Sequence, residues 1–447
     1  MEREQWASKL GFILAAVGSA VGLGNVWRFS TLAGESGGAA FLIIYVACIL
    51  LVGLPVLMAE FSVGRRGQSD AIQSYYNIES GSKWSFGGFL GVLSAFLILS
   101  FYGVIAGWIT YFLYAYLTGT AQGVEAGGYG DFFGGFIGGV AGPLFWQFLF
   151  MAIVIGIVYF GIKRGIEVAN KLFMPLLAII LIVLAIYSLT LDGAGEAMNF
   201  LFAPDWSAFT NADVYTGAIG QAFFTLSLGM GAMITYASYL GKEEKLSSAA
   251  GTIVTLDTLF AIIVGVVIFP IVFTFGIDPA SGPTLLFISL PEVFNMLGGA
   301  GTVVAIFFFF LVAVAALTSA ISLLEVNVAY FMRKMNWSRK QATLIAGIVI
   351  TAVGIPSALS QGGPVTMTFF GNSFLDSIDI LTAEYTLLLG GLVTSLFVGW
   401  GWKKMDALKE SGFGESIFGV LWIWFIRVVA PVAIFVLLAI NFYKDFL

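Results

Sequence analysis

Long apolar runs separated by short polar connections dominate the chain. Runs of about 20 or more mainly hydrophobic residues can cross the hydrocarbon core of a bilayer as α-helices. We expect such spans near residues 10–35, 39–64, 88–118, 143–161, 166–190, 213–240, 247–275, 300–332, 341–358, 378–401 and 417–441. The pattern therefore predicts an all-α integral membrane protein with eleven transmembrane helices.

The first span is interrupted near its middle. The stretch "AAVGSAVGLGNVWRF", residues 15–29, places glycines and Asn25 inside the apolar run and follows them with Arg28. A bilayer holds no water to bind freed backbone groups, so such a break is tolerated only where these groups line a cavity or bind something. The break therefore predicts a binding site.

The sixth span contains a similar interruption. Its "SLGMGA", residues 227–232, resembles "SAVGLGN", residues 19–25, five spans earlier. A repeat with an odd number of spans, here five, places the second copy upside down in the membrane. Glycine-interrupted segments at matching places in two such halves indicate a binding site of a transporter at the middle of the membrane. The alternative is that glycines only allow close helix packing. We predict two inverted five-helix repeats, helices 1–5 and 6–10, with broken first and sixth helices, as domains 1–190 and 191–402. The eleventh helix and the C-terminus occupy 403–447.

Positive charge lies in alternate connections. The basic groups are Arg3 and Lys9; Arg65, Arg66 and Lys83; Lys163, Arg164 and Lys171; Lys242 and Lys245; Arg333, Lys334, Arg339 and Lys340; Lys403, Lys404 and Lys409. The intervening connections, 119–142, 191–212, 276–299 and 359–377, contain no Lys or Arg. The positive-inside rule then predicts a cytoplasmic N-terminus and, with eleven spans, an extracellular C-terminus. The connection 276–299 is apolar enough to pack back as a short helical hairpin, with a surface loop as the alternative.

Composition narrows the function classes. The chain is 59% hydrophobic, has a formal net charge of −6, and contains no histidine and one cysteine, Cys48. An intrachain disulfide is impossible, and the commonest metal ligand and acid–base group is missing. Asp257 has no second carboxylate at the spacing of an intramembrane aspartyl enzyme. We therefore expect no enzyme activity and no nucleic-acid partner, and a lipid bilayer as the surroundings.

Broken helices carry a specific chemistry. Their N-terminal ends offer N–H groups to an anion and their C-terminal ends offer carbonyls to a cation, so one break can hold a zwitterion and Na⁺. Hard oxygen ligands for Na⁺ are available from Asn25, Thr225, Ser227, Asp257, Thr318 and Ser319. An ionisable group within a span costs roughly 3 kcal/mol unless paired, so Asp257 indicates function. The alternatives are that Asp257 has a purely structural role and that the Ser and Thr hydroxyls bond only to carbonyls of their own helix.

Two long motifs carry a resemblance to a known family. "WASKLGFILAAVGSAVGLGNVWRF" and "AFFTLSLGMGAMITYASYL" resemble the neurotransmitter:sodium symporter family and, within it, the bacterial amino-acid transporters with the leucine-transporter fold. The resemblance covers nearly the whole chain. It implies two inverted five-helix repeats plus an eleventh helix, two Na⁺ ions, and a multi-pass protein of the bacterial plasma membrane. We expect a monomer or weak dimer.

The resemblance also implies site residues. The first sodium site would use Ala20, Asn25, Thr225, Asp257 and the substrate carboxylate; the second would use Gly18, Val21, Ala315, Thr318 and Ser319. The substrate pocket would use Ala20, Gly22, Gly24, Ile98, Tyr102, Phe224, Ser227, Met230, Ser319 and Leu323. Arg28 and Asp379 match the outer gate, and Arg3, Trp6 and Tyr239 the inner gate. "GIEVANKLFMP", from Gly165 to Pro175, resembles the family's Gly-x9-Pro motif, whose unwinding opens a water path to the second sodium.

Three departures from the family pattern refine the expectation. Gly22 stands where monoamine-transporting relatives carry an aspartate, which favours a substrate with its own carboxylate. Asp257 replaces a neutral sodium ligand beside Tyr45 and Gln221, which match a chloride site in other members, so its charge could replace chloride. The family's acidic partner for the inner arginine falls on Arg333, so we expect no acidic partner at this position.

The function expected is Na⁺-coupled symport of neutral hydrophobic L-amino acids, such as Trp, Leu, Ile, Phe and Tyr, by alternating access. Two Na⁺ per substrate and independence from chloride are expected. Met230 is adaptable and fits a pocket for apolar side chains of varied size, although it could merely pack. The alternative function is an ion channel or pore, which would need polar residues along a continuous path rather than at one depth.

Overall fold

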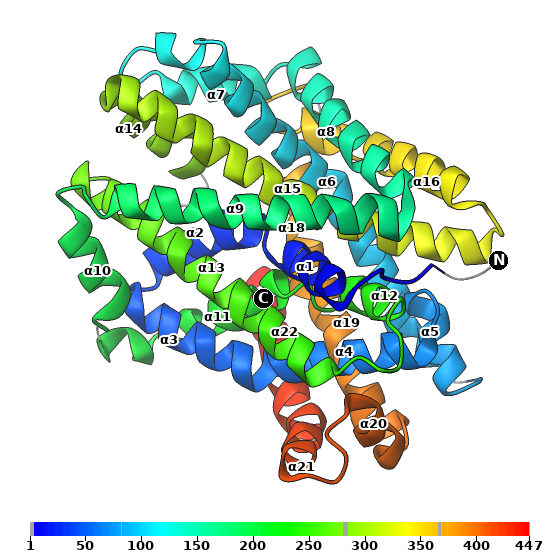
Figure 1. The fold of residues 1–447 in the computed structure, drawn as a ribbon. Coiled ribbons are helices and arrows are strands. Elements are labelled where there is room, and N and C mark those ends of the chain that lie inside the picture. The colour runs from blue at the N-terminus through cyan, green and yellow to red at the C-terminus, as the bar shows by residue number, and fades with distance from the viewer. Residues whose placement is uncertain are drawn as a thin grey trace.

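Helices make up almost all of the structure (Figure 1). It is a computed structural model that describes residues 4–81, 83–204, 206–279, 285–364, 368–369 and 371–446. Many elements are continuous helices with a short π-helical turn (η) in their path. The path of the chain is α1 (Lys9–Ala20), η1 (Gly24–Arg28), α2 (Phe29–Glu35), α3 (Ala39–Cys48), η2 (Ile49–Gly53), α4 (Leu54–Gly67), α5 (Ala71–Ile78), α6 (Ser85–Leu117), α7 (Tyr129–Ile137), α8 (Ala141–Tyr159), η4 (Ile162–Ile166), α9 (Glu167–Ser188), α10 (Ala194–Phe202), α11 (Ala212–Thr225), α12 (Ala232–Ala237) and α13 (Leu246–Thr274).

The second part of the chain is also almost entirely helical. Its elements are η6 (Leu285–Ser289), α14 (Leu290–Met296), α15 (Gly298–Lys334), α16 (Arg339–Val353), α17 (Ile355–Leu359), β1 (Thr368–Phe369), β2 (Asn372–Ser373), α18 (Phe374–Ile380), η7 (Leu381–Thr386), α19 (Leu387–Leu396), η8 (Phe397–Gly401), α20 (Lys404–Ser411), α21 (Ile417–Trp424), η9 (Phe425–Val429) and α22 (Ala430–Phe446). Two 3-10 turns, η3 (Ala121–Gly123) and η5 (Trp206–Thr210), lie in connections. The strands β1 and β2 form a small antiparallel pair.

The expected spans match helices of the structure. Within the described residues, 9 helices are long and apolar enough to cross a membrane, and the bent pair α1 and η1–α2 raises the number to 10. The expected span 213–240 corresponds to the shorter helices α11 and α12, with residues 226–231 between them. A multi-pass membrane fold is therefore established, whereas the total of eleven spans, the inverted repeats and the domain limits remain predictions.

The predicted break in the first span is confirmed. Ser8 caps α1, because its hydroxyl accepts a hydrogen bond from the Gly11 N–H at 3.0 Å. The helix ends at Ala20, where Val21 takes an extended conformation, and the chain resumes as a helix bent by 50° from α1. The helix α1 therefore stops inside the molecule, which leaves its last carbonyls without helical partners.

Positive φ angles explain the break between α11 and α12. Ser227, Gly229 and Gly231 have φ angles of 52°, 76° and 72°. Glycine reaches this left-handed region without steric cost, whereas Ser227 adopts it at some cost. A Cβ at Gly229 would also lie 1.9 Å from the Leu387 carbonyl oxygen, so a side chain has no room there. The backbone conformation therefore favours glycine at 229 and 231, and packing against Leu387 also requires it at 229.

The helix α1 lies at the centre of the molecule. It packs against α9, α13, α15 and α12, and its residues from Ala15 to Ala20 are buried. Figure 1 shows α9 and α13 running beside it. The helix α15 in turn packs along α6. Both breaks therefore meet the centre of the bundle, away from lipid.

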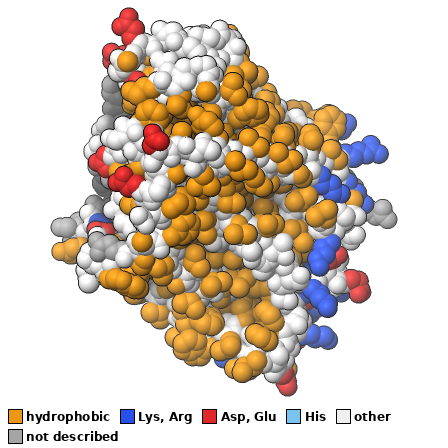
Figure 2. Space-filling view, turned by 60° about the vertical axis from the view of Figure 1, so that its left-hand side comes forward, with side chains coloured by type: hydrophobic (Ala, Val, Ile, Leu, Met, Phe, Trp, Pro, Cys, Tyr) orange, Lys and Arg blue, Asp and Glu red, His pale blue; other side chains and the backbone are white. Residues whose placement is uncertain are grey.

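The outer faces of the bundle are apolar. On α9 the exposed side chains include Leu172, Ile179, Ile182 and Ile186. Figure 2 shows hydrophobic side chains over much of one face, with most visible Lys and Arg at one edge and several Asp and Glu at the opposite edge. This distribution suits helices that face lipid between two aqueous surfaces.

The apolar connection after α13 packs inward. Residues 280–284 lie outside the described part, and the segment after them forms η6 and α14. Leu285, Phe287, Leu290 and Phe294 are buried. The inward packing expected for this connection is confirmed, and it covers the outer end of the bundle.

Candidate ion and substrate site

A small cavity lies between the two helix breaks. Its lining contains all ten residues predicted for the substrate pocket, joined by Ser19, Leu23 and Ser322. The elements α1, η1, α6, α11 and α15 and the segment between α11 and α12 contribute to it. The volume is about 20 Å³, which accommodates little more than one water molecule. Side chains around it must therefore move before a larger molecule enters.

The walls of the cavity divide into polar and apolar parts. The Ser227 hydroxyl donates to the Ser19 carbonyl at 2.8 Å, and the Ser19 hydroxyl lies 2.7 Å from the Ser322 hydroxyl. The apolar part comes from other elements, through Ile98, Phe224, Met230 and Leu323. Such a cavity suits a small molecule with one polar end and one apolar end.

Two glycines set the shape of this cavity. A Cβ at Gly22 would lie 2.4 Å from the Ser319 hydroxyl oxygen and 3.2 Å from that of Tyr102. A Cβ at Gly24 would lie 2.7 Å from the Phe224 ring. A side chain at either position would fill the cavity or displace its wall.

Three residues of the predicted first sodium site are in direct contact. The Asn25 amide donates to the Asp257 carboxylate at 2.8 Å and to the Thr225 hydroxyl at 2.9 Å. The Thr225 hydroxyl lies 3.0 Å from both carboxylate oxygens. All three side chains are buried, and Ala20 lies at the adjacent end of α1. Carboxylate, amide and hydroxyl oxygens are hard donors that suit Na⁺.

The predicted second sodium site joins α1 to α15. The Ser319 hydroxyl lies 3.3 Å from the Gly18 carbonyl and 3.3 Å from the Val21 carbonyl. One residue earlier, the Thr318 hydroxyl donates to the Ala315 carbonyl at 3.0 Å. The five predicted ligands therefore gather as carbonyl and hydroxyl oxygens, a donor set that suits a hard monovalent cation.

A larger cavity opens on the outer side of the small one. It has a volume of about 360 Å³. We call it the vestibule. Leu23, Gly24, Tyr102 and Phe224 line both cavities, so the Phe224 ring lies between them. Phe287 of η6 and Trp108 of α6 pack on the vestibule wall.

The residues predicted for the outer gate face the vestibule without pairing. Arg28 and Asp379 both line it. Within the described part of the chain no ion pair joins them, and the Arg28 guanidinium instead lies 5.2 Å from the centre of the Phe224 ring. The outer path is therefore open in this structure as far as Phe224.

The opposite end of the path is closed. Trp6 donates its indole N–H to the Tyr236 carbonyl at 2.9 Å, and its backbone N–H to the Tyr239 carbonyl at 3.3 Å. Arg3 lies outside the described residues. Glu167 of α9 accepts from the Ala7 N–H at 2.7 Å and so holds the N-terminal segment in place. Trp6 and Tyr239 thus sit where an inner gate is predicted.

A buried ion pair at this inner end was missed by sequence reasoning. The Glu325 carboxylate accepts from the Tyr239 hydroxyl at 2.6 Å and from the Arg339 guanidinium at 2.7 and 2.9 Å. Arg339 also contacts Glu4 at 3.0 Å. Glu325 lies two helix turns before Arg333 on α15. A carboxylate within an apolar span was the available signal, as it was for Asp257.

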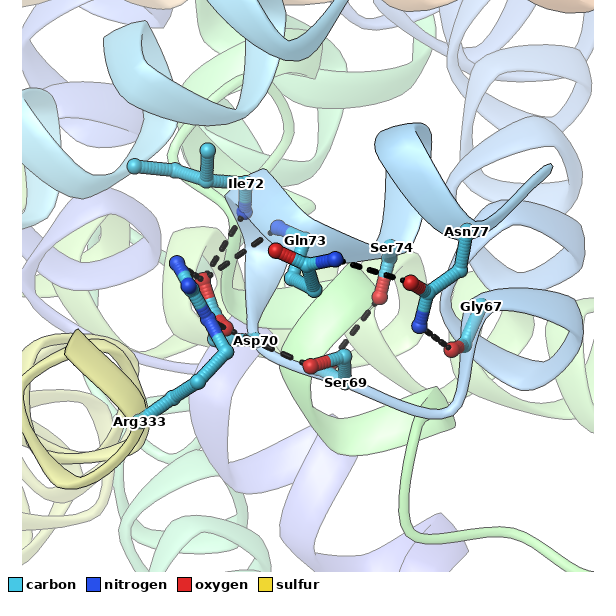
Figure 3. Close-up of polar contacts among 8 residues, drawn as sticks. All are labelled: Gly67, Ser69, Asp70, Ile72, Gln73, Ser74, Asn77 and Arg333. Atoms are coloured by element: carbon cyan, nitrogen blue, oxygen red, sulfur yellow. Dashed lines mark hydrogen bonds and ion pairs between the residues drawn. The ribbon is translucent and has the colours of Figure 1, made fainter. Parts of the chain in front are cut away.

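Arg333 itself has an acidic partner. Its guanidinium pairs with the Asp70 carboxylate, which also caps α5 by accepting from the Ile72 N–H at 3.2 Å (Figure 3). In Figure 3 the arginine reaches from α15 to the start of α5. Arg333, which stands where the family carries an acid, therefore forms an ion pair with Asp70.

Two further features complete the site. Glu60 of α4, also missed from the sequence, is fully buried and accepts from the Gly229 N–H at 2.7 Å, so it holds the second break. The segment from Gly165 to Pro175 is wound in this structure, with a π-helical turn that includes Gly165 and with Pro175 inside α9. A Cβ at Gly165 would lie 2.0 Å from the Ile157 carbonyl oxygen.

Comparison with known proteins identifies the family. Residues 3–122 and 137–445 match the sequence profile of the sodium:neurotransmitter symporter family. The chain belongs to this family. As such a symporter it is a sodium-dependent membrane transporter and not an enzyme.

Close relatives of this symporter span its whole length. An uncharacterized sodium-dependent transporter of Bacillus subtilis (strain 168), YhdH, is 39% identical over 436 residues, which cover 97% of this chain and 96% of that protein. A sodium-dependent transporter of Haemophilus influenzae is 34% identical over 455 residues, 99% of each. The crystal structure of MhsT in complex with L-phenylalanine has 54% sequence identity and a TM-score of 0.92, covering 98% of this chain and 100% of MhsT.

Proposed function

We propose that this symporter imports neutral hydrophobic L-amino acids together with two Na⁺ ions by alternating access. The observation that carries the proposal is the cavity between the two helix breaks, with oxygen clusters beside it. Its lining combines backbone breaks and serine hydroxyls with Ile98, Phe224, Met230 and Leu323. The similar protein MhsT is described in complex with L-phenylalanine, which has the same combination of charged and apolar ends.

Two oxygen clusters support a stoichiometry of two sodium ions. The Asn25–Thr225–Asp257 group and the group around Ser319 draw on different helices, α13 and α15, and share α1 with its continuation. Two charges moved across 100 mV supply roughly 4.6 kcal/mol. This is enough for an amino-acid gradient of about a thousandfold before the sodium gradient is counted.

Independence from chloride follows from the charge of Asp257. Its carboxylate sits in the first cluster, with Gln221 close by, since the Gln221 amide donates to the Gly24 carbonyl at 2.8 Å. A fixed negative charge there would take the place of an anion beside the first sodium. We therefore propose that transport proceeds without chloride.

The direct test is uptake into proteoliposomes loaded without sodium. We expect Na⁺-dependent accumulation of labelled leucine, competed by Ile, Phe, Trp and Tyr but not by Lys or Glu, and unchanged when gluconate replaces chloride. Equal uptake in sodium-free buffer would contradict symport. Asp257→Asn should make the remaining uptake depend on chloride, whereas Asp131→Asn, at an exposed position on α7, should behave as the unmodified protein.

A further inference from the structure

Asn170 is a buried amide with an unused acceptor. It lies on α9, within the segment from Gly165 to Pro175, and is 0% exposed. Its Nδ2 donates to the Ile166 carbonyl one turn earlier at 2.9 Å. Its Oδ1 has no hydrogen-bond partner in the part of the chain that the structure describes. A buried carbonyl oxygen left in this way needs an explanation.

The free oxygen points at the predicted second sodium site. A Cβ at Gly18 would lie only 2.1 Å from Asn170 Oδ1, and 3.1 Å from the Thr318 Cβ. The amide oxygen and Thr318 therefore approach Gly18 in the space that a side chain there would take. Gly18 and Thr318 are both among the five predicted ligands. The absence of a side chain at Gly18 is what lets the amide come so close.

We propose that Asn170 Oδ1 is a sixth oxygen ligand of the second sodium ion, supplied by α9. The inference rests on the proposed function, because it assumes an ion at this site. Hard cations surround themselves with six or more oxygens, and the five predicted ligands come from α1, its continuation and α15 alone. An uncharged amide oxygen adds coordination without adding charge.

This ligand would tie the second ion to the segment from Gly165 to Pro175. Asn170 stands between that glycine and that proline, so unwinding the segment would carry its oxygen away from Gly18 and Thr318. Loss of one ligand weakens the ion's binding in the open form relative to the wound form.

The chain offers a matched control for this proposal. Asn327 of α15 is also buried, donates to the Leu323 carbonyl one turn earlier at 3.1 Å, and has an unpaired Oδ1 within the described residues. It lies nine residues after Thr318 on the same helix, roughly 13 Å along its axis. Asn327→Leu therefore removes a similar amide at a distance from the ion.

The test is a sodium titration of the purified full-length protein without amino acid. Bound ²²Na⁺ and the sodium-dependent rise in melting temperature are both recorded, for the unmodified protein, Asn170→Leu, Asn170→Asp and Asn327→Leu. We expect Asn170→Leu to raise the half-saturating sodium concentration of one of two ions at least tenfold. Asn170→Asp should lower it at least threefold, and Asn327→Leu should leave it unchanged.

The outcomes separate the two proposals. The role of Asn170 would be overturned if Asn170→Leu gave the same sodium titration curve as the unmodified protein. It would also be overturned if Asn327→Leu raised the half-saturating sodium concentration as much as Asn170→Leu does. If Asn170→Leu does not fold, the Asn170→Asp variant decides, because aspartate is nearly equal in size to asparagine and preserves the packing. A sodium affinity of Asn170→Asp that is unchanged or weaker would overturn the ligand role. Failure of the unmodified protein to bind sodium would instead contradict the proposed function.

Discussion

Single residues control the substrate cavity mainly where a side chain is missing. Gly22 and Gly24 bring the backbone up to Ser319, Tyr102 and Phe224. A methyl group at Gly22 would overlap the Ser319 hydroxyl, which also lies beside the carbonyls of Gly18 and Val21. The backbone at this point is thus shared by the small cavity and the predicted second sodium site.

Gly22→Ala should therefore lower amino-acid affinity at least tenfold while the protein still inserts. The cause is loss of space in a cavity of about 20 Å³. Equilibrium binding of labelled leucine at saturating sodium measures it. Gly156→Ala on α8, where an added Cβ meets nothing within 4 Å, serves as the control and should bind normally. Normal affinity in Gly22→Ala would mean that the substrate binds elsewhere.

Sequence reasoning located the polar groups that interrupt apolar runs, because glycine and asparagine are costly there. The residues that line the cavity, among them the apolar Ile98, Met230 and Leu323, were instead predicted through the resemblance to the symporter family. Sequence reasoning missed Asn170, Glu60 and Glu325, whose meaning depends on partners more than a hundred residues away or on a neighbouring helix. Pairing of Glu325 with Tyr239, for example, follows only from how α15 packs against the end of α12.

At the scale of elements, contacts of α15 with the end of α12 and the start of α16 hold the inner end closed. Glu325 of α15 bonds to Tyr239, which follows α12, and to Arg339 at the start of α16. Trp6, in the segment before α1, donates its backbone N–H to the Tyr239 carbonyl and so joins the same group. The closed inner end thus depends on one buried carboxylate that contacts two elements.

Glu325→Gln should open the inner end. It would leave the buried Arg339 without its main partner, and breaking a buried pair in this way costs about 3–5 kcal/mol. We expect weaker leucine binding at saturating sodium and a lower melting temperature, both recorded on purified protein. Glu415→Gln, at an exposed loop position, should change neither. An unaltered Glu325→Gln protein would exclude a gating role for this carboxylate.

At the scale of the whole molecule, an open vestibule at one end and a closed path at the other together describe a transporter that opens to one aqueous side. The vestibule reaches Phe224, whereas Trp6 and Glu325 close the other side. Arg339 pairs with Glu325 at the closed end, and Figure 2 shows most of the visible Lys and Arg at a single edge of the molecule. Orientation in the membrane then follows from the positive-inside rule rather than from the fold alone.

The two termini should lie on opposite sides of the membrane. An epitope after Leu447 should be reached by antibody added to intact spheroplasts, and an epitope before Met1 only after permeabilisation. The expectation follows from an odd number of spans with a cytoplasmic start. Labelling of both epitopes, or of neither, in intact cells would show that one span has been miscounted.

The contact between Gly22 and Asn25 has a consequence for the order of events. The Gly22 N–H donates to Asn25 Oδ1 at 3.0 Å. If that oxygen turns to a sodium ion, the N–H is released and becomes available to a carboxylate. A protein without sodium therefore presents a weaker anion site, so the cation should bind first and the amino acid second. Wasteful movement of amino acid alone would be suppressed by one shared hydrogen bond.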